Sequence, residues 1–183
     1  MTDKELIAAI LEGNTQAFSQ MVKRFERLVS HIVFRLIDNE MDREEIAQDI
    51  FVKVHKNLGA FNFQSKLSTW VATIAYREAV NHLKKNKKWK EMKDLEQVEF
   101  QLEASTLSYE TEDMNRFIHR AVNQLPETYR AILTLYHLDG FSYQEIVAVM
   151  DMPEGTVKNY LFRARKKLRD LLAKHYDQEA FIS

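Results

Sequence analysis

Cationic side chains concentrate in one short segment near the end of this 183-residue chain. Six basic residues and no acidic residue lie between positions 155 and 169. On a helix, Val157 and Leu161 would share one face, while Asn159 and Arg163 would point largely the other way. Basic groups bind phosphates and amides bind base edges, so such a helix suits the major groove of DNA. The segment predicts a DNA-reading helix; the alternative is a solvated basic helix.

The residues just before this helix predict a second helix and a tight turn. Ser142 and Glu145 have the spacing of a capping box, which starts a helix by satisfying its free N–H groups. Pro153 disfavours helical geometry in the residue before it and is tolerated at the start of a new helix. Residues 142–168 are therefore predicted to form a helix-turn-helix, a geometry that also occurs in proteins that do not bind DNA.

A second basic segment lies in the first half of the chain. Residues 84–93 contain six lysines, and they follow a stretch with Phe61, Phe63 and Trp70. A cationic groove with aromatic platforms is what holds single-stranded nucleic acid. Core positions for Phe61 and Trp70 are the alternative. Residues 94–113 then contain seven acidic residues and no basic one, which suits a connector that should not bind DNA.

Composition limits the classes of protein that fit this chain. The net charge of −1 is the sum of two basic segments and one acidic one. Four glycines and two prolines favour an all-helical chain, and the absence of cysteine excludes disulfides and thiolate metal sites. No apolar run approaches the roughly 20 residues that a membrane helix needs. The first 13 residues lack the pattern of a signal peptide.

Hydrophobic periodicity predicts an all-α fold of two small helical domains joined by a flexible linker. In the first half it predicts helices at residues 14–37, 42–58 and from about 65–68 to 88. In the second half it predicts helices at 113–124 and 126–138, ahead of the helix-turn-helix. The expected domains are 1–88 and 113–176, with an acidic linker at 89–112 and a frayed tail at 177–183.

Residue patterns for catalysis are missing. No two of the six histidines have the His-x-x-x-His spacing of a zinc helix, and there is no Walker-type loop or nucleophile elbow. Glu44, Glu45 and Asp49 cluster on one predicted helix, where a solvated or docking face is the simpler interpretation. We therefore expect no enzyme activity, no metal, no cofactor and no small-molecule substrate.

Several motifs resemble the extracytoplasmic-function (ECF) sigma factors of bacterial RNA polymerase. The stretch LPETYRAILTLYHLDGFSYQEIVAVM followed by GTVKNYLFRARKKL resembles sigma region 4. EEIAQDIFVKVHKNL resembles region 2.2, FNFQSKLSTW the loop that opens region 2.3, and TWVATIAYREAVNHLKK regions 2.3 and 2.4. The resemblance covers almost the whole chain apart from the linker.

The resemblance implies three contact surfaces. One would dock on the coiled coil of the polymerase β′ subunit: Glu45, Gln48, Asp49 and Phe51. A second would meet the non-template strand of the minus-ten element: Asn62, Phe63, Gln64, Ser65, Lys66, Arg77, Asn81 and Lys84. A third would read the minus-thirty-five element while the β-subunit flap holds the helix: Thr156, Lys158, Asn159, Phe162, Arg163 and Lys166.

Some positions depart from the family's usual pattern, namely Arg77, Tyr160 and the large exposed Phe162. These departures affect which promoter sequence is expected, and they leave the expected class of protein, a sigma factor, unchanged. The expected function is that of a transcription-initiation sigma factor in the bacterial cytoplasm. Its expected partners are core RNA polymerase, duplex and single-stranded promoter DNA, and an anti-sigma factor that could hold it at the inner membrane. The alternatives are a stand-alone LuxR-like helix-turn-helix regulator and a helical adaptor that binds only protein.

Overall fold

The computed structural model describes residues 1–94 and 114–180, with side chains for residues 1–85 and 118–173. All regular structure in these ranges is helical, which confirms the predicted all-α class. The first unit, residues 1–94, contains α1 (Asp3–Leu11), α2 (Thr15–Leu36), α3 (Glu40–Asn57), the short η1 (Leu58–Ala60) and α4 (Leu67–Asp94). The second unit, residues 114–180, contains α5 (Met114–Asn123), α6 (Glu127–Leu133), η2 (Thr134–Leu138), α7 (Tyr143–Met150) and α8 (Glu154–Ala180).

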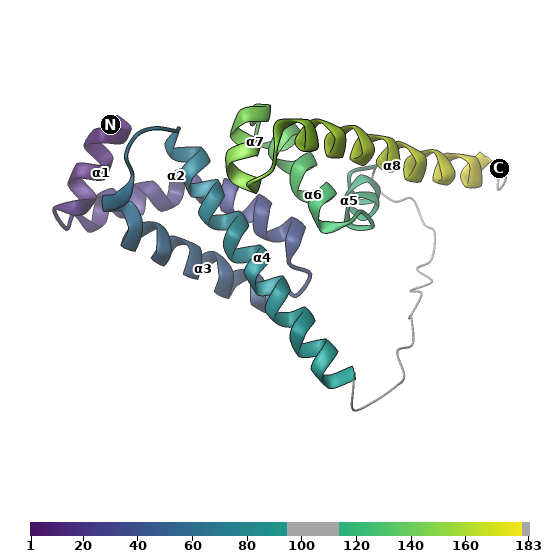
Figure 1. The fold of residues 1–183 in the computed structure, drawn as a ribbon, viewed down its shortest axis with the longest axis horizontal. Coiled ribbons are helices and arrows are strands. Elements are labelled where there is room, and N and C mark those ends of the chain that lie inside the picture. Colours follow the sequence, from purple (N-terminus) through teal and green to yellow (C-terminus); the bar gives the residue numbers. More distant parts are fainter. Residues whose placement is uncertain (95–113, 181–183) are drawn as a thin grey trace.

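The first unit is built around α2, which packs against α1, α3 and α4 (Figure 1). Asn14 caps α2 by accepting a hydrogen bond from the backbone amide of Ala17, and Asn39 caps α3 in the same way. Buried residues recur at helical spacing along α2, as the sequence predicts, and include Met21, Phe25 and Val29. The resulting bundle fixes the orientation of α4 and of the loop that precedes it.

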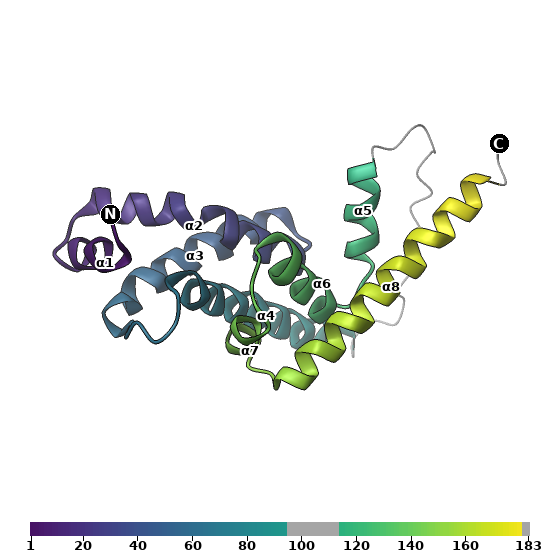
Figure 2. The same ribbon diagram turned by 90° about the horizontal axis from the view of Figure 1, so that it is seen from above.

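The second unit is a helix-turn-helix supported by α5 and α6. Its capping box is present, because Ser142 and Glu145 exchange side-chain and backbone hydrogen bonds at the start of α7. Asp151 has a φ of 54° and ends α7 in the left-handed conformation, so the chain turns directly into α8. Both α5 and α6 pack against α8, which projects away from the first unit (Figures 1 and 2).

The two units are in direct contact. Figure 2 shows α6 and α7 lying across the first unit, where α7 packs against α4 and α6 packs against α2. Polar pairs cross the boundary: His31 Nδ1 lies 2.8 Å from Asp139 Oδ1, and an Arg35 Nη lies 2.7 Å from His119 Nδ1. The buried cores of the two units join into one cluster as a result.

Four elements differ from the sequence-based expectation. Helix α1 was not predicted, although Thr2 and Glu5 form a capping box like that of α7. The helix expected to end near residue 88 continues to Asp94, so the first residues of the expected linker are helical; residues 95–112 lie outside the described residues. The helix expected at 126–138 is divided into α6 and a π-helical turn, η2, and Gly140 follows with a φ of 68°. Helix α8 reaches Ala180, inside the expected frayed tail.

Candidate nucleic-acid interfaces

The loop between η1 and α4 has a locally defined backbone. Asn62 Oδ1 accepts a hydrogen bond of 3.2 Å from the amide of Gln64, and the Ser65 hydroxyl donates one of 3.3 Å to the carbonyl of Lys66. Phe63 has a φ of 60°, a conformation that is uncommon for residues other than glycine. The side chains of residues 62–66 are all exposed. The loop therefore presents amide, hydroxyl, ammonium and aromatic groups to solvent.

Three aromatic rings support this loop. Phe61 is buried and belongs to the core, while its ring centroid lies 4.8 Å from that of Phe63 and 5.4 Å from that of Trp70. Trp70 is half-buried against the same core. Phe63 keeps 46% of its surface exposed, and Lys4 Nζ lies 5.7 Å from its ring centroid. Of the three, Phe63 is thus the ring most available to stack on a base.

A polar row continues from the loop along α4. Arg77, Asn81 and Lys84 are exposed at i, i+4 and i+7, over about 10 Å of helix axis. Ala75 and Ala79, on the opposite face of α4, are fully buried. The loop therefore leads directly into the helix that carries this polar row, and a strand-binding surface needs both kinds of group along one path.

Helix α8 separates its faces as the sequence predicts. Val157, Leu161 and Ala164 are buried at 0–1% exposure, and Leu168 is half-buried. The other side presents an exposed row of polar and aromatic groups: Lys158, Asn159, Phe162, Arg163 and Lys166. Thr156 is half-buried at the start of the row. Phe162 exposes 68% of its surface, and such a ring suits contact with a thymine methyl group.

Two residues of this helix are engaged within their own unit. Lys158 Nζ lies 2.6 Å from Glu154 Oε1 and 5.5 Å from the ring centroid of Tyr143. The hydrogen bond to Glu154 raises the pKa of Lys158 above its usual range. Tyr160 is half-buried, with its ring centroid 5.7 Å from that of Tyr129 on α6. Tyr160 therefore helps to pack α8 on its unit, which accounts for one departure from the family pattern.

The candidate docking surface lies on α3. Glu45, Gln48 and Asp49 are exposed, and Phe51 is half-buried against the core. Ile46 and Ile50, on the other face of α3, are buried. This candidate surface is separate in the chain from the loop and from α8.

Glu145 and Thr69 were not predicted as site residues. Glu145 Oε1 lies 3.0 Å from Lys66 Nζ and accepts a hydrogen bond of 3.3 Å from the Thr69 hydroxyl. Burial acts to raise the pKa of Glu145, but the hydrogen bonds from Ser142 and Lys66 outweigh it and lower that pKa to about 2. The sequence showed the capping role of Glu145 but gave no signal for a partner 79 positions earlier.

The described residues contain neither a metal-binding cluster nor a membrane-crossing helix. No group of His, Cys, Asp and Glu side chains is arranged to hold a metal ion in the part of the chain with described residues. Among the helices of those residues, none combines the length and apolarity that crossing a bilayer requires.

Comparison with known families agrees with the division into two units. Residues 21–89 match the model of Sigma-70 region 2, and residues 117–168 match that of Sigma-70, region 4. The first match covers the bundle that carries the loop and α4, and the second covers the helix-turn-helix. Together they define the chain as a sigma-70-type protein.

Similar proteins narrow the class further. The chain is 31% identical over 178 residues to the ECF RNA polymerase sigma-E factor of Escherichia coli (strain K12), covering 92% of this chain and 93% of that one. It is 29% identical over 176 residues to the RNA polymerase sigma-H factor of Pseudomonas aeruginosa, covering 91% of each. The chain belongs to the ECF family of RNA polymerase sigma factors.

Solved structures share the fold. The sigma factor RpoE of Bartonella quintana, determined in complex with the anti-sigma factor NepR, has a TM-score of 0.68 and 25% identity, over 85% of this chain and 96% of that one. CnrH, determined in complex with the cytosolic domain of CnrY, has a TM-score of 0.68 and 23% identity over 94% and 97%. The chain functions as a sigma factor in transcription initiation, and a stand-alone LuxR-like regulator is not favoured, because both sigma regions are present.

Proposed function

We propose that this sigma factor engages polymerase through α3 and a two-part promoter through two separate surfaces. Glu45, Gln48, Asp49 and Phe51 dock on the coiled coil of the β′ subunit. Residues 62–66 with Arg77, Asn81 and Lys84 bind the non-template strand of the minus-ten element. The exposed face of α8 reads the minus-thirty-five element as duplex, held by the flap of the β subunit.

One observation carries this proposal: a single chain presents two DNA-suited surfaces of different kinds. The loop displays short polar groups and an exposed ring, which can contact the pairing edge of a base only after that base has left the stack. Helix α8 displays a straight row of cations and amides, which fits the regular major groove. A simple regulator would need only the second surface.

Partners and location follow from the same assignment. Core polymerase and promoter DNA place the protein in the bacterial cytoplasm. An anti-sigma factor is a further proposed partner, supported by the complex of the similar sigma factor RpoE with the anti-sigma factor NepR. Such a partner could hold the chain at the inner membrane. The chain itself needs no cofactor and no small-molecule substrate for this role.

The test is transcription with purified core polymerase from templates randomised at both promoter elements. We expect selection of an asymmetric two-part site, and no selection without the sigma factor. Replacement of residues 62–66 by another polar loop should change the preferred minus-ten base and leave upstream preference intact. Selection of one symmetric duplex site without polymerase would contradict the proposal in favour of a regulator.

The docking surface has its own test in Asp49→Ala. Loss of a charge-assisted contact that is buried in an interface costs about 2–5 kcal/mol of binding free energy. The control is Glu26→Ala, which removes an exposed carboxylate from a different helix, α2. Titration of labelled protein with core polymerase should show weaker binding for Asp49→Ala alone. Equal affinities for the two variants would remove Asp49 from the interface.

A further inference from the structure

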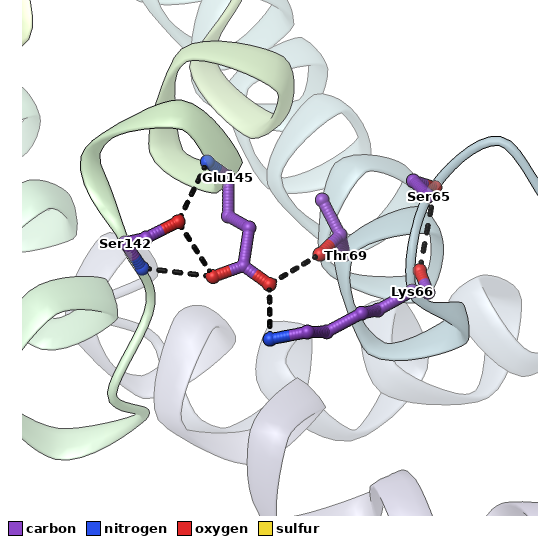
Figure 3. Close-up of polar contacts among 5 residues, drawn as sticks. All are labelled: Ser65, Lys66, Thr69, Ser142 and Glu145. Atoms are coloured by element: carbon purple, nitrogen blue, oxygen red, sulfur yellow. Dashed lines mark hydrogen bonds and ion pairs between the residues drawn. The ribbon is translucent and has the colours of Figure 1, made fainter.

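The helix-turn-helix unit places a carboxylate on the loop that we assign to the minus-ten strand. Figure 3 shows Glu145, at the start of α7, between Ser142 of its own unit and Lys66 and Thr69 of the other. One carboxylate oxygen, Oε2, accepts hydrogen bonds of 2.8 Å from the amide and the hydroxyl of Ser142. The other oxygen, Oε1, is shared by Lys66 Nζ and the Thr69 hydroxyl. Each oxygen thus serves one unit.

This contact is part of a packed boundary. Thr69 is 2% exposed and the Glu145 side chain 19% exposed. Ala72, one turn along α4 from Thr69, is fully buried, and α4 packs against α7. The polar pairs His31–Asp139 and Arg35–His119 tie the second unit to α2 as well. Two helices of the first unit, α2 and α4, therefore contact the second unit.

The arrangement conflicts with reading both promoter elements at once. By their names, the elements lie about 25 base pairs apart, which is roughly 85 Å of duplex at about 3.4 Å per base pair. Helix α8 is only 27 residues long, or about 40 Å, and starts directly after a helix that touches α4. The second unit must therefore leave the first before both elements can be bound.

We propose that Glu145 holds the free chain in this closed arrangement by occupying, on Lys66 and Thr69, the position that a phosphate of the minus-ten strand takes. A carboxylate and a phosphate oxygen make the same charge-assisted contact with an ammonium group. Strand binding and interdomain closure are then mutually exclusive, and each lowers the population of the other. The second half of this inference rests on the proposed role of Lys66.

The first experiment measures closure without DNA. Because the chain has no cysteine, Lys23→Cys and Lys167→Cys create the only two labelling sites, both at exposed positions in different units. Single-molecule energy transfer between the labels reports the closed and open populations of the full chain. Glu145→Gln keeps an acceptor for the Ser142 cap, as glutamine does in capping boxes, and removes the charge facing Lys66. We expect its ratio of closed to open molecules to fall by about threefold to tenfold.

The matched control is Glu154→Gln. It removes a carboxylate whose partner, Lys158, lies in the same helix, so the closed population should not change. Thr69→Val provides a second variant that keeps shape and leaves the cap untouched, and it should open the chain by a smaller factor. A parent chain without a closed population, or a Glu145→Gln variant as closed as the parent, would overturn the proposal.

The second experiment tests competition with DNA. A single-stranded oligonucleotide carrying the non-template minus-ten sequence should open the labelled parent as its concentration rises. Fluorescence anisotropy should show that Glu145→Gln binds this oligonucleotide about threefold to tenfold more tightly than the parent. If the variant opens but its affinity for the oligonucleotide is unchanged, the competition is refuted. The oligonucleotide is also titrated against the chain bound to polymerase, to find the concentration that saturates it. If neither the free parent nor the free variant binds the oligonucleotide at that concentration, Lys66 is not part of a strand site in the free chain.

Discussion

The minus-ten loop and helix α8 both present polar and aromatic groups to solvent, but they are held in shape differently. Helix α8 rests on a buried stripe, with Val157 and Leu161 at 0% and 1% exposure. The loop has no such stripe along its length and depends on Phe61 beneath it and on short side-chain to backbone hydrogen bonds. It also contains a residue in the left-handed conformation, Phe63.

This difference matches the two forms of DNA that we assign to the surfaces. A duplex has a regular groove, so a rigid helix meets it with little ordering cost on binding. An unpaired strand has no fixed shape, so a short loop that can adjust is better suited to capture one base. The loop also has to release the Glu145 contact, whereas most of the exposed row on α8 is already open to solvent.

The largest expected effect compares two phenylalanines, one for each surface. Phe61→Ala should lower the free energy of unfolding by about 3–5 kcal/mol, because a buried ring is lost from beneath the loop. Phe162→Ala, which removes an exposed ring from α8, should change it by less than about 0.5 kcal/mol. Urea denaturation followed by circular dichroism measures both. If the two variants lowered the free energy of unfolding by similar amounts, Phe61 would not be the ring that supports the loop.

Sequence periodicity was sufficient for the faces of α8. Apolar residues at positions 157, 161 and 164 recur at helical spacing, and all three are buried. Capping chemistry also predicted the start of α7 correctly. Such features depend on residues fewer than eight positions apart, and this is the range in which a pattern in one sequence carries structural information.

Features that depend on distant residues could not be predicted in the same way. The contact of Glu145 with Lys66 joins positions far apart, and Glu145 already had a sufficient local role as a cap. The left-handed conformation of Phe63 has no sequence signal, since the position carries neither glycine nor asparagine. Helix α1 is a different case, because its Thr2–Glu5 capping box is a local signal of the same kind as that of α7.

Arg163→Ala tests whether α8 recognises sequence. If Arg163 contacts a guanine edge, the variant should lose about 1–3 kcal/mol of upstream binding and relax preference at one base pair. The control is Arg165→Ala: Arg165 Nε donates a hydrogen bond of 3.1 Å to His137, and its guanidinium lies 4.9 Å from the Tyr136 ring centroid. The measurement is binding of polymerase holoenzyme to DNA with a randomised upstream element. Any loss of affinity caused by Arg165→Ala should be the same for every sequence. If Arg163→Ala also lost the same affinity for every upstream sequence, Arg163 would contact only phosphate.

The pH dependence of Glu145 tests whether its charge stabilises the folded chain, through the Ser142 cap first and the Lys66 contact second. Its pKa is lowered from 4.5 to about 2, so the ionised form stabilises the folded chain fully above about pH 4.5, and that stabilisation is lost as the pH falls toward 2. Glu145→Gln should therefore be less stable than the parent by about 1–2 kcal/mol at pH 7. The difference should shrink as the pH approaches 2. A difference that does not vary with pH would show that the charge of Glu145 is not responsible.

The smallest expected effect concerns the backbone of the loop. At a φ of 60°, Phe63→Gly should be more stable than Phe63→Ala by about 1 kcal/mol, because glycine adopts the left-handed conformation without the steric cost that a Cβ brings. Phe34 provides the matched control, because its ring is also about half exposed but lies inside α2. There the order should reverse, with Phe34→Gly less stable than Phe34→Ala by about 1 kcal/mol, since glycine is a poor helix former. Thermal unfolding of the four variants measures both differences. The same order at both positions would mean that the loop does not hold Phe63 in the left-handed conformation, and the contrast between an adjustable loop and a regular helix would then lose its structural basis.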